Sequence, residues 1–174
     1  MTGTFSESEG LVLSAQVEGL GNDTHYTPHT THHTPHTKNM FRVTKEIHFC
    51  YGHRLLNYAG KCRNLHGHNG KAVITLEAPG LDALGMVVDF SELKRVVGSW
   101  IDEALDHRMI LHRDDPALPE LCRLGEPVVV LDVNPTAENI AKLIFDRTAA
   151  SGLPVVEVTL WETENSFATY RPGT

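Results

Sequence analysis

Alternating apolar and polar positions predict a set of short β-strands in the chain after residue 39. From Phe41 to Cys50 the apolar side chains fall mostly on every second position, which is the period of a strand with one buried face. A turn is expected at Gly80–Gly85. Further strands are expected near Asn69–Ala78, Met86–Asp89, Val128–Val133, Glu157–Glu164 and Phe167–Arg171, the last two as a hairpin-like pair.

Two other segments carry apolar residues at helical spacing. The first helix is expected to run from an N-cap at Ser91 to about Leu105, and the second from an N-cap at Thr136 to near Gly152. A loop containing Asp114, Asp115 and Pro116 is expected between them. The two apolar stripes are Leu93, Val96, Val97, Trp100, Ile101 and Leu105, and Ala137, Ile140, Ala141, Ile144 and Phe145.

This order of elements indicates an α+β fold with both helices on one face of an antiparallel sheet. A sheet of this size has open edges and a second face without helices, and open edges invite pairing with other chains. A ring of subunits that continues the sheet into a barrel would cover both. The pattern permits this oligomer without requiring it.

Residues 1–39 differ from the rest of the chain and are expected to be a disordered extension, followed by a single domain at residues 40–174. The stretch Asn22–Asn39 is rich in Thr and Pro and contains five histidines: His25, His29, His32, His33 and His36. These imidazoles can capture a metal, or the segment can be a tolerated tail, including one created by an upstream start codon. Met40 is a plausible native start.

Composition narrows the class of protein. With 174 residues and 41% hydrophobic content the chain can bury a core, and its net charge of -7 argues against a nucleic-acid-binding surface. No apolar run is long enough to span a membrane, and no secretory signal is evident. Three cysteines at unrelated spacings do not form a disulfide framework, so a reducing cytoplasm is expected.

The candidate chemistry centres on the run Cys62-Arg-Asn-Leu-His66-Gly-His68, which leads into a strand. Alternate residues of a strand point to the same face, so both imidazoles can reach one cation. His53, at the end of another strand-like run, supplies a third. Three neutral histidines with an open fourth position form the ligand set of a catalytic zinc site, and no methionine or second cysteine accompanies them to favour copper.

Cys62 has three possible roles: a catalytic thiolate, a fourth metal ligand, or an inert structural residue. A nearby metal together with Lys61 and Arg63 would lower the pKa of its thiol and favour the first role. Cys50 and Cys122 lack such neighbours and are expected to be packing residues.

Two further candidates are weak when taken alone. Asp106 and His107 can form a proton relay, but this pair can equally end a helix. Glu162, on an apolar strand, can face solvent or can anchor a ligand that presents paired N–H donors.

From about Phe41 to Pro172 the chain resembles the family of 6-pyruvoyltetrahydropterin and 6-carboxytetrahydropterin synthases, the latter belonging to the queuosine pathway. The landmarks that carry the resemblance occur in family order: Phe49–Leu55, Cys62–His68, Gly85–Phe90, Leu105–His107, Asn134–Asn139 and Val158–Thr163. The resemblance implies the tunnelling fold (T-fold), in which sheets join into an oligomeric barrel. It also implies a homohexamer with active sites at subunit interfaces.

The resemblance also implies roles for individual residues. The zinc ligands are His53, His66 and His68, and Cys62 is the catalytic thiol. Asp106 and His107 form a relay that in this family tends to come from a neighbouring subunit. The residues implied to bind the pterin are Glu162, which grips the ring, and Thr136 and Glu138, which lie in a segment lining the pocket.

The spacing Cys62-x-x-x-His66 resembles the carboxy-forming branch, and both branches are implied to act on 7,8-dihydroneopterin triphosphate. The alternatives are the pyruvoyl-forming reaction and a non-catalytic zinc-binding module, in which Cys62 would ligate the metal. The candidates to bind the triphosphate are the basic residues Arg54, Lys61 and Lys71. The segment Leu111–Val133 looks longer than in compact members of the family and can reshape the entrance to the active site.

Overall fold

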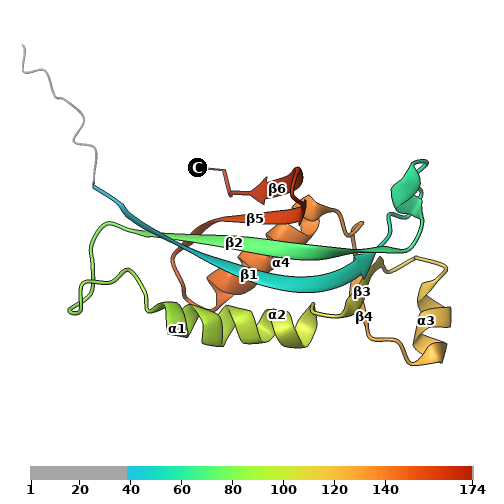
Figure 1. The fold of residues 1–174 in the computed structure, drawn as a ribbon, viewed down its shortest axis with the longest axis horizontal. Helices are drawn as coiled ribbons and strands as arrows, with labels where there is room; N and C mark the ends of the chain where they lie inside the picture. The colour runs from blue at the N-terminus through green and yellow to red at the C-terminus, as the bar shows by residue number, and fades with distance from the viewer. Residues whose placement is uncertain (1–38, 174) are drawn as a thin grey trace, which may run out of the picture. The chain divides into compact units, whose positions relative to one another are not determined.

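The computed structural model describes residues 39–173, whose centre is one curled six-stranded sheet with strand order β4-β3-β1-β2-β5-β6. Figure 1 shows the long β1–β2 pair running across the molecule. The strands are β1 Phe41–His53, β2 His66–Ala78, β3 Arg108–His112, β4 Val128–Leu131, β5 Val155–Thr163 and β6 Ser166–Tyr170.

β1 and β2 pair antiparallel along their whole length, from Phe41 opposite Ala78 to His53 opposite His66. Both strands are therefore three residues longer than predicted at the end that carries the histidines. Because facing residues of a pair lie on the same face, this register fixes which side chains share a surface. His53 and His66 lie on the face that also carries the buried Phe49 and Ile74.

Both predicted helices are present and cover that face (Figure 1). The first is a continuous helical segment, made of α1 (Phe90–Leu93), a π-helical turn (Lys94–Gly98) and α2 (Ser99–Ala104). The second is α4, Ala137–Ala150, which Thr136 caps as predicted. Their apolar stripes and the inward residues of β1, β2 and β5 form one hydrophobic core, which includes Leu93, Val97, Ile101, Ile140, Ile144 and Leu160.

The first helix begins two residues earlier than predicted. Its N-cap is Asp89 rather than Ser91, because the Asp89 carboxylate accepts a hydrogen bond from the backbone N–H of Ser91. The prediction that Met86–Asp89 extends the sheet is wrong, since these residues form the turn that leads into this cap.

The α+β class is confirmed, but the sheet is mixed rather than antiparallel. β3 runs parallel to β1, and β4 runs parallel to β3. β3 was not predicted, nor was the short helix α3, Leu118–Leu124, which follows the Asp114–Pro116 turn. The segment after Leu111 therefore carries a helix and a strand of its own.

A buried ion pair joins the end of β1 to the turn before α3. The Nε–H of Arg54 donates to Oδ2 of Asp115 at 2.7 Å, and its Nη2 contacts the other carboxylate oxygen. Burial alone would raise the pKa of Asp115, but the hydrogen bonds from Arg54 and from the backbone N–H of Ala117 hold it below its usual value.

Arg54→Met is expected to destabilise the protein by about 3 kcal/mol in urea unfolding, because it leaves a buried carboxylate without its partner. The pair stabilises at neutral pH, and this contribution is lost as the pH falls below about 4, since the folded pKa is the lower one. Arg113→Met, which breaks the exposed pair with Asp132, is the control and should change stability by less than about 1 kcal/mol. Equal losses in the two variants would contradict the structural role of Arg54.

Residues 39–173 belong to one compact unit, and no helix among them is long and apolar enough to cross a membrane. The expected extension, with its five histidines, lies outside the described residues apart from Asn39. The division at residue 40 therefore stays a prediction.

Candidate metal centre and its surroundings

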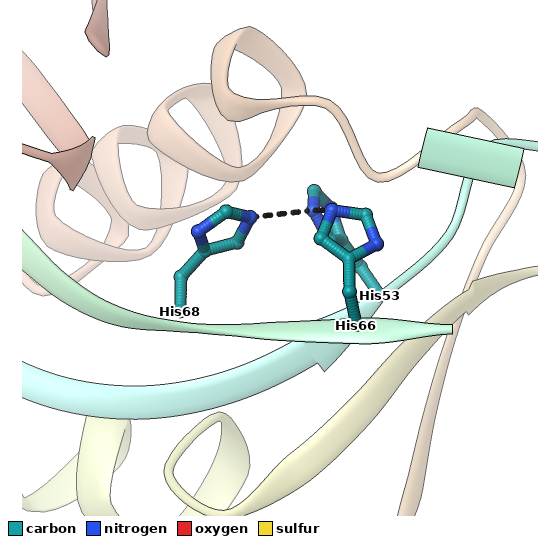
Figure 2. Close-up of side chains that lie close together, drawn as sticks. All are labelled: His53, His66 and His68. Carbon is teal, nitrogen blue, oxygen red and sulfur yellow. Dashed lines mark hydrogen bonds between the residues drawn. The ribbon is translucent and has the colours of Figure 1, made fainter. Parts of the chain in front are cut away.

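Three imidazoles converge where β1 ends and β2 begins (Figure 2). Nε2 of His53 lies 3.1 Å from Nε2 of His66 and 3.2 Å from Nε2 of His68. The three histidines form the one group of at least three potential metal ligands found in residues 39–173, with donor atoms within 4.8 Å of one another. The spacing predicted from the sequence is thus realised by the strand register.

The outer nitrogens of two rings fix their tautomers. Nδ1–H of His53 donates to the carbonyl oxygen of Pro135 at 2.6 Å, and Nδ1–H of His66 donates to that of Asn64 at 2.8 Å. A carbonyl can only accept, so in the neutral rings both Nε2 atoms carry lone pairs. Two lone pairs 3.1 Å apart repel unless a cation lies between them, so this arrangement favours a metal ion over a direct hydrogen bond between the rings.

The donor set fits zinc. Tetrahedral ligands with Zn–N bonds of about 2.0–2.1 Å are separated by about 3.3 Å, close to the two measured distances. Burial lowers the pKa of His53, which keeps the ring neutral and able to ligate. Three close histidines could therefore bind a metal ion and are compatible with Zn²⁺.

The segment before α4 supports the first histidine. The side chain of Asn134 bonds to both backbone groups of Leu56, accepting from its N–H at 2.7 Å and donating to its carbonyl at 3.0 Å. Asn139 in turn donates to the carbonyl of Asn134 at 2.9 Å. These bonds hold the Pro135 carbonyl in place, and a metal ligand oriented by a second group is typical of metal sites.

Glu162 lies beside the cluster on the same face. Its Oε1 is 3.7 Å from Nε2 of His53 and 4.0 Å from Nε2 of His68, and it accepts a hydrogen bond from the Tyr51 hydroxyl at 3.1 Å. Burial, and then the neighbouring carboxylate, raise the pKa of Tyr51, so the phenol stays protonated and donates. Of the two sequence readings of Glu162, the structure supports an inward carboxylate.

Asp106 and His107 form an oriented pair. Nδ1–H of His107 donates to Oδ2 of Asp106 at 2.7 Å, and Oδ1 of Asp106 accepts the backbone N–H of Cys50 at 2.7 Å. Burial alone would raise the pKa of Asp106, but these bonds hold it below its usual value. With both carboxylate oxygens engaged, Nε2 of the imidazole is left free as a base.

This pair faces away from the three histidines. His107 precedes β3 by one residue and bonds through its N–H to the carbonyl of Cys50, whose side chain lies on the face without α4. It helps to line a hollow of about 510 Å³ with Cys50, Asn69 and Met109, which His66 and His68 also border, and its side chain is 78% exposed. Within one chain, the relay and the metal cluster are therefore on opposite faces of the sheet.

The other residues predicted for the site are not members of the three-histidine cluster. Cys62 is half-buried on a 3-10 turn, Lys61–Arg63, and is not a member of the three-histidine group. Thr136 caps α4 and Glu138 is exposed on its first turn. The basic candidates are Arg54, which is engaged by Asp115, Lys71, which pairs with Glu46 at 3.4 Å, and the exposed Lys61.

Two participants were missed by sequence reasoning. The Pro135 carbonyl is a backbone acceptor, and the type of residue does not reveal such a role. Tyr51 could have been identified from the sequence. It lies two residues before the predicted ligand His53 in a strand-like run, so its hydroxyl group is expected on the same face.

Comparison with known proteins identifies the family of the chain. The family profile described as "6-pyruvoyl tetrahydropterin synthase" matches residues 42–173. A Rickettsia bellii protein named 6-carboxy-5,6,7,8-tetrahydropterin synthase is 40% identical over 135 residues, covering 74% of this chain and 98% of its own. Several bacterial relatives with that name are 33–40% identical.

A human protein named 6-pyruvoyl tetrahydrobiopterin synthase is 32% identical, over 75% of this chain and 90% of its own. The solved structure of Caenorhabditis elegans 6-pyruvoyl tetrahydropterin synthase matches the fold with a TM-score of 0.58 at 24% identity, covering 78% and 97% of the two chains. The expected T-fold is confirmed for the single chain, and the joining of sheets into an oligomeric barrel stays a prediction. The chain belongs to the 6-pyruvoyl tetrahydropterin synthase family, as its motifs indicated.

Proposed function

We propose that this protein is a zinc-dependent 6-carboxy-5,6,7,8-tetrahydropterin synthase. It converts 7,8-dihydroneopterin triphosphate and water to 6-carboxytetrahydropterin, acetaldehyde and triphosphate, a lyase reaction of queuosine biosynthesis. The observation that carries the proposal is the cluster of three Nε2 atoms beside an inward carboxylate. It occurs in a chain whose bacterial relatives bear this enzyme name.

His53, His66 and His68 would hold the zinc ion, which supplies Lewis-acid chemistry that acidifies the side-chain hydroxyls of the substrate. Their two fixed Nδ1–H bonds keep the rings aimed before any ligand arrives. Three protein ligands leave a coordination position for substrate, as in catalytic rather than structural zinc sites.

Glu162 would anchor the pterin. A pterin presents adjacent N–H donors on its pyrimidine edge, and a carboxylate accepts such a pair in a bidentate manner. The Glu162 side chain is 21% exposed, so a ligand can reach it. Thr136 and Glu138 are proposed, more peripherally, to line the pocket.

Proton transfer would fall to Cys62 and to His107. Asp106 holds Nδ1–H of the imidazole, which directs the basic Nε2 outward. Moving protons on the two sides of the substrate side chain requires two groups that approach it from different directions. Cys62 and the relay, on different parts of the fold, meet this requirement in an assembly.

The alternative is the pyruvoyl-forming reaction, which eliminates triphosphate without cleaving the side chain; the human relative carries that name. Purified protein given 7,8-dihydroneopterin triphosphate should release acetaldehyde if the proposal holds. The interaction-module alternative required Cys62 as a ligand, and the three-histidine cluster gives it no support.

We also propose that sites are shared between subunits of a homo-oligomer, with a hexamer as the expected size. By the strand register the relay lies with Cys50 on the face opposite the three imidazoles, although His107, His66 and His68 border the same hollow. A neighbouring chain's relay would complete each site.

Mixing Cys62→Ala with His107→Ala and reassembling the oligomer should restore part of the activity that each variant lacks. Some mixed sites would combine an intact Cys62 from one chain with an intact His107 from another. Activity is measured after subunit exchange has been verified by mass spectrometry. Verified mixed oligomers without activity would show that the two residues act within one chain.

A further inference from the structure

We propose that Tyr51 is a positioning residue that holds the Glu162 carboxylate for substrate and keeps it out of the metal's coordination sphere. This inference rests on the proposed function, because it assigns Glu162 to pterin binding. The inference adds that Tyr51 determines whether the Glu162 carboxylate binds the pterin or the metal.

The competition follows from the distances. Oε1 of Glu162 is 3.7 Å from Nε2 of His53 and 4.0 Å from Nε2 of His68. A carboxylate oxygen is itself a good zinc ligand. A small side-chain rotation toward the point where the imidazoles converge would make Glu162 a fourth ligand and close the position needed for substrate.

Tyr51 opposes that rotation with a hydrogen bond to the same oxygen, at 3.1 Å. Hydrogen bonds to charged groups are stronger than neutral ones. The bond uses one lone pair of the oxygen nearest the histidines, so the second lone pair of that oxygen and the other oxygen remain available to the two N–H donors of a pterin.

The phenol is held by packing as well. Tyr51 is 3% exposed, its ring stacks on Phe49 with centroids 5.4 Å apart, and it lies edge-on to His53 at 5.4 Å. Gly70 leaves the room the ring needs, since a Cβ there would approach Cε1 of Tyr51 to 2.9 Å. A hydroxyl on a ring fixed this way is a rigid donor, as a positioning residue requires.

The test compares Tyr51→Phe, Glu162→Gln and the double variant, each loaded with zinc and checked for folding. The dissociation constant for neopterin, an unreactive pterin without triphosphate, should rise about tenfold in Tyr51→Phe, as expected from losing one hydrogen bond to a charged group. The double variant should bind no worse than Glu162→Gln, because Tyr51 acts through Glu162. Tyr170→Phe, a change in a half-buried tyrosine on β6, should bind as wild type does.

Cobalt-substituted protein gives a second readout. The visible d–d spectrum should change in Tyr51→Phe, where Glu162 becomes free to ligate, and should return toward wild type in the double variant. A residue that acts only through packing would not produce this reversal. Glu162→Asp, which shortens the arm by one methylene while Tyr51 remains, should also weaken neopterin binding.

Wild-type neopterin affinity in Tyr51→Phe, with Glu162→Gln impaired, would overturn the inference and leave the proposed function intact. If instead Glu162→Gln binds neopterin as wild type does, the pterin assignment of Glu162 fails, and the inference fails with it.

Discussion

Replacing His66 with alanine is expected to remove both the bound metal and the activity. Nε2 of His66 lies 3.1 Å from Nε2 of His53, and its ring is aimed by the Asn64 carbonyl, so the variant loses one of the three converging imidazole donors. Altering groups that merely orient metal ligands costs 10–100-fold, so loss of a ligand should lower turnover by at least about a hundredfold. Metal analysis should find about one zinc per wild-type subunit and far less in the variant.

His112→Ala is the matched control, because His112 is also a half-buried histidine at a strand end and its Nδ1 accepts a backbone N–H from Asp114. It should keep metal and turnover. An active His66→Ala protein that contains no metal would contradict the role assigned to the cluster.

Replacing Cys62 with alanine should leave zinc content, folding and pterin binding intact while turnover collapses. The reason is that Cys62 is proposed as a proton-transfer group and lies outside the three-histidine set. General acid–base groups contribute about 10²–10⁴-fold, which sets the expected loss. Single-turnover kinetics on the zinc-loaded variant would measure it.

Cys122→Ala serves as the control, since Cys122 is an exposed thiol on α3. Its kinetics should match wild type. Zinc lost from Cys62→Ala, with zinc retained in the control, would instead favour the ligand role for this thiol.

Much of the fold followed from local patterns, but the mixed sheet did not. Alternation from Phe41 and the stripes from Leu93 and Ala137 identified the elements that supply the core. β3 was missed because only a three-residue turn without Gly or Pro separates Arg108–His112 from the first helix, and because the strand pairs in parallel with a distant strand. Such non-local pairing leaves no period in the sequence.

Part of the candidate site was also predicted from local spacing in the sequence. Period-two spacing predicted that His66 and His68 share a face, and the structure adds why His53 joins them: the β1–β2 register runs to the last residue of β1. The strands exceed their predicted ends because inward positions there hold the histidines instead of apolar residues, while the ladder continues. Placement of the Asp106–His107 pair on the other face depends on tertiary packing, which the local sequence does not encode.

The most direct test of the central claim is to identify the products that the zinc-loaded protein forms from 7,8-dihydroneopterin triphosphate. We expect 6-carboxytetrahydropterin, with acetaldehyde and triphosphate released in equal amounts, as measured by mass spectrometry and by trapping of the aldehyde. His66→Ala protein provides the background. Triphosphate release with a pyruvoyl product and no acetaldehyde, or no turnover at all, would contradict the account.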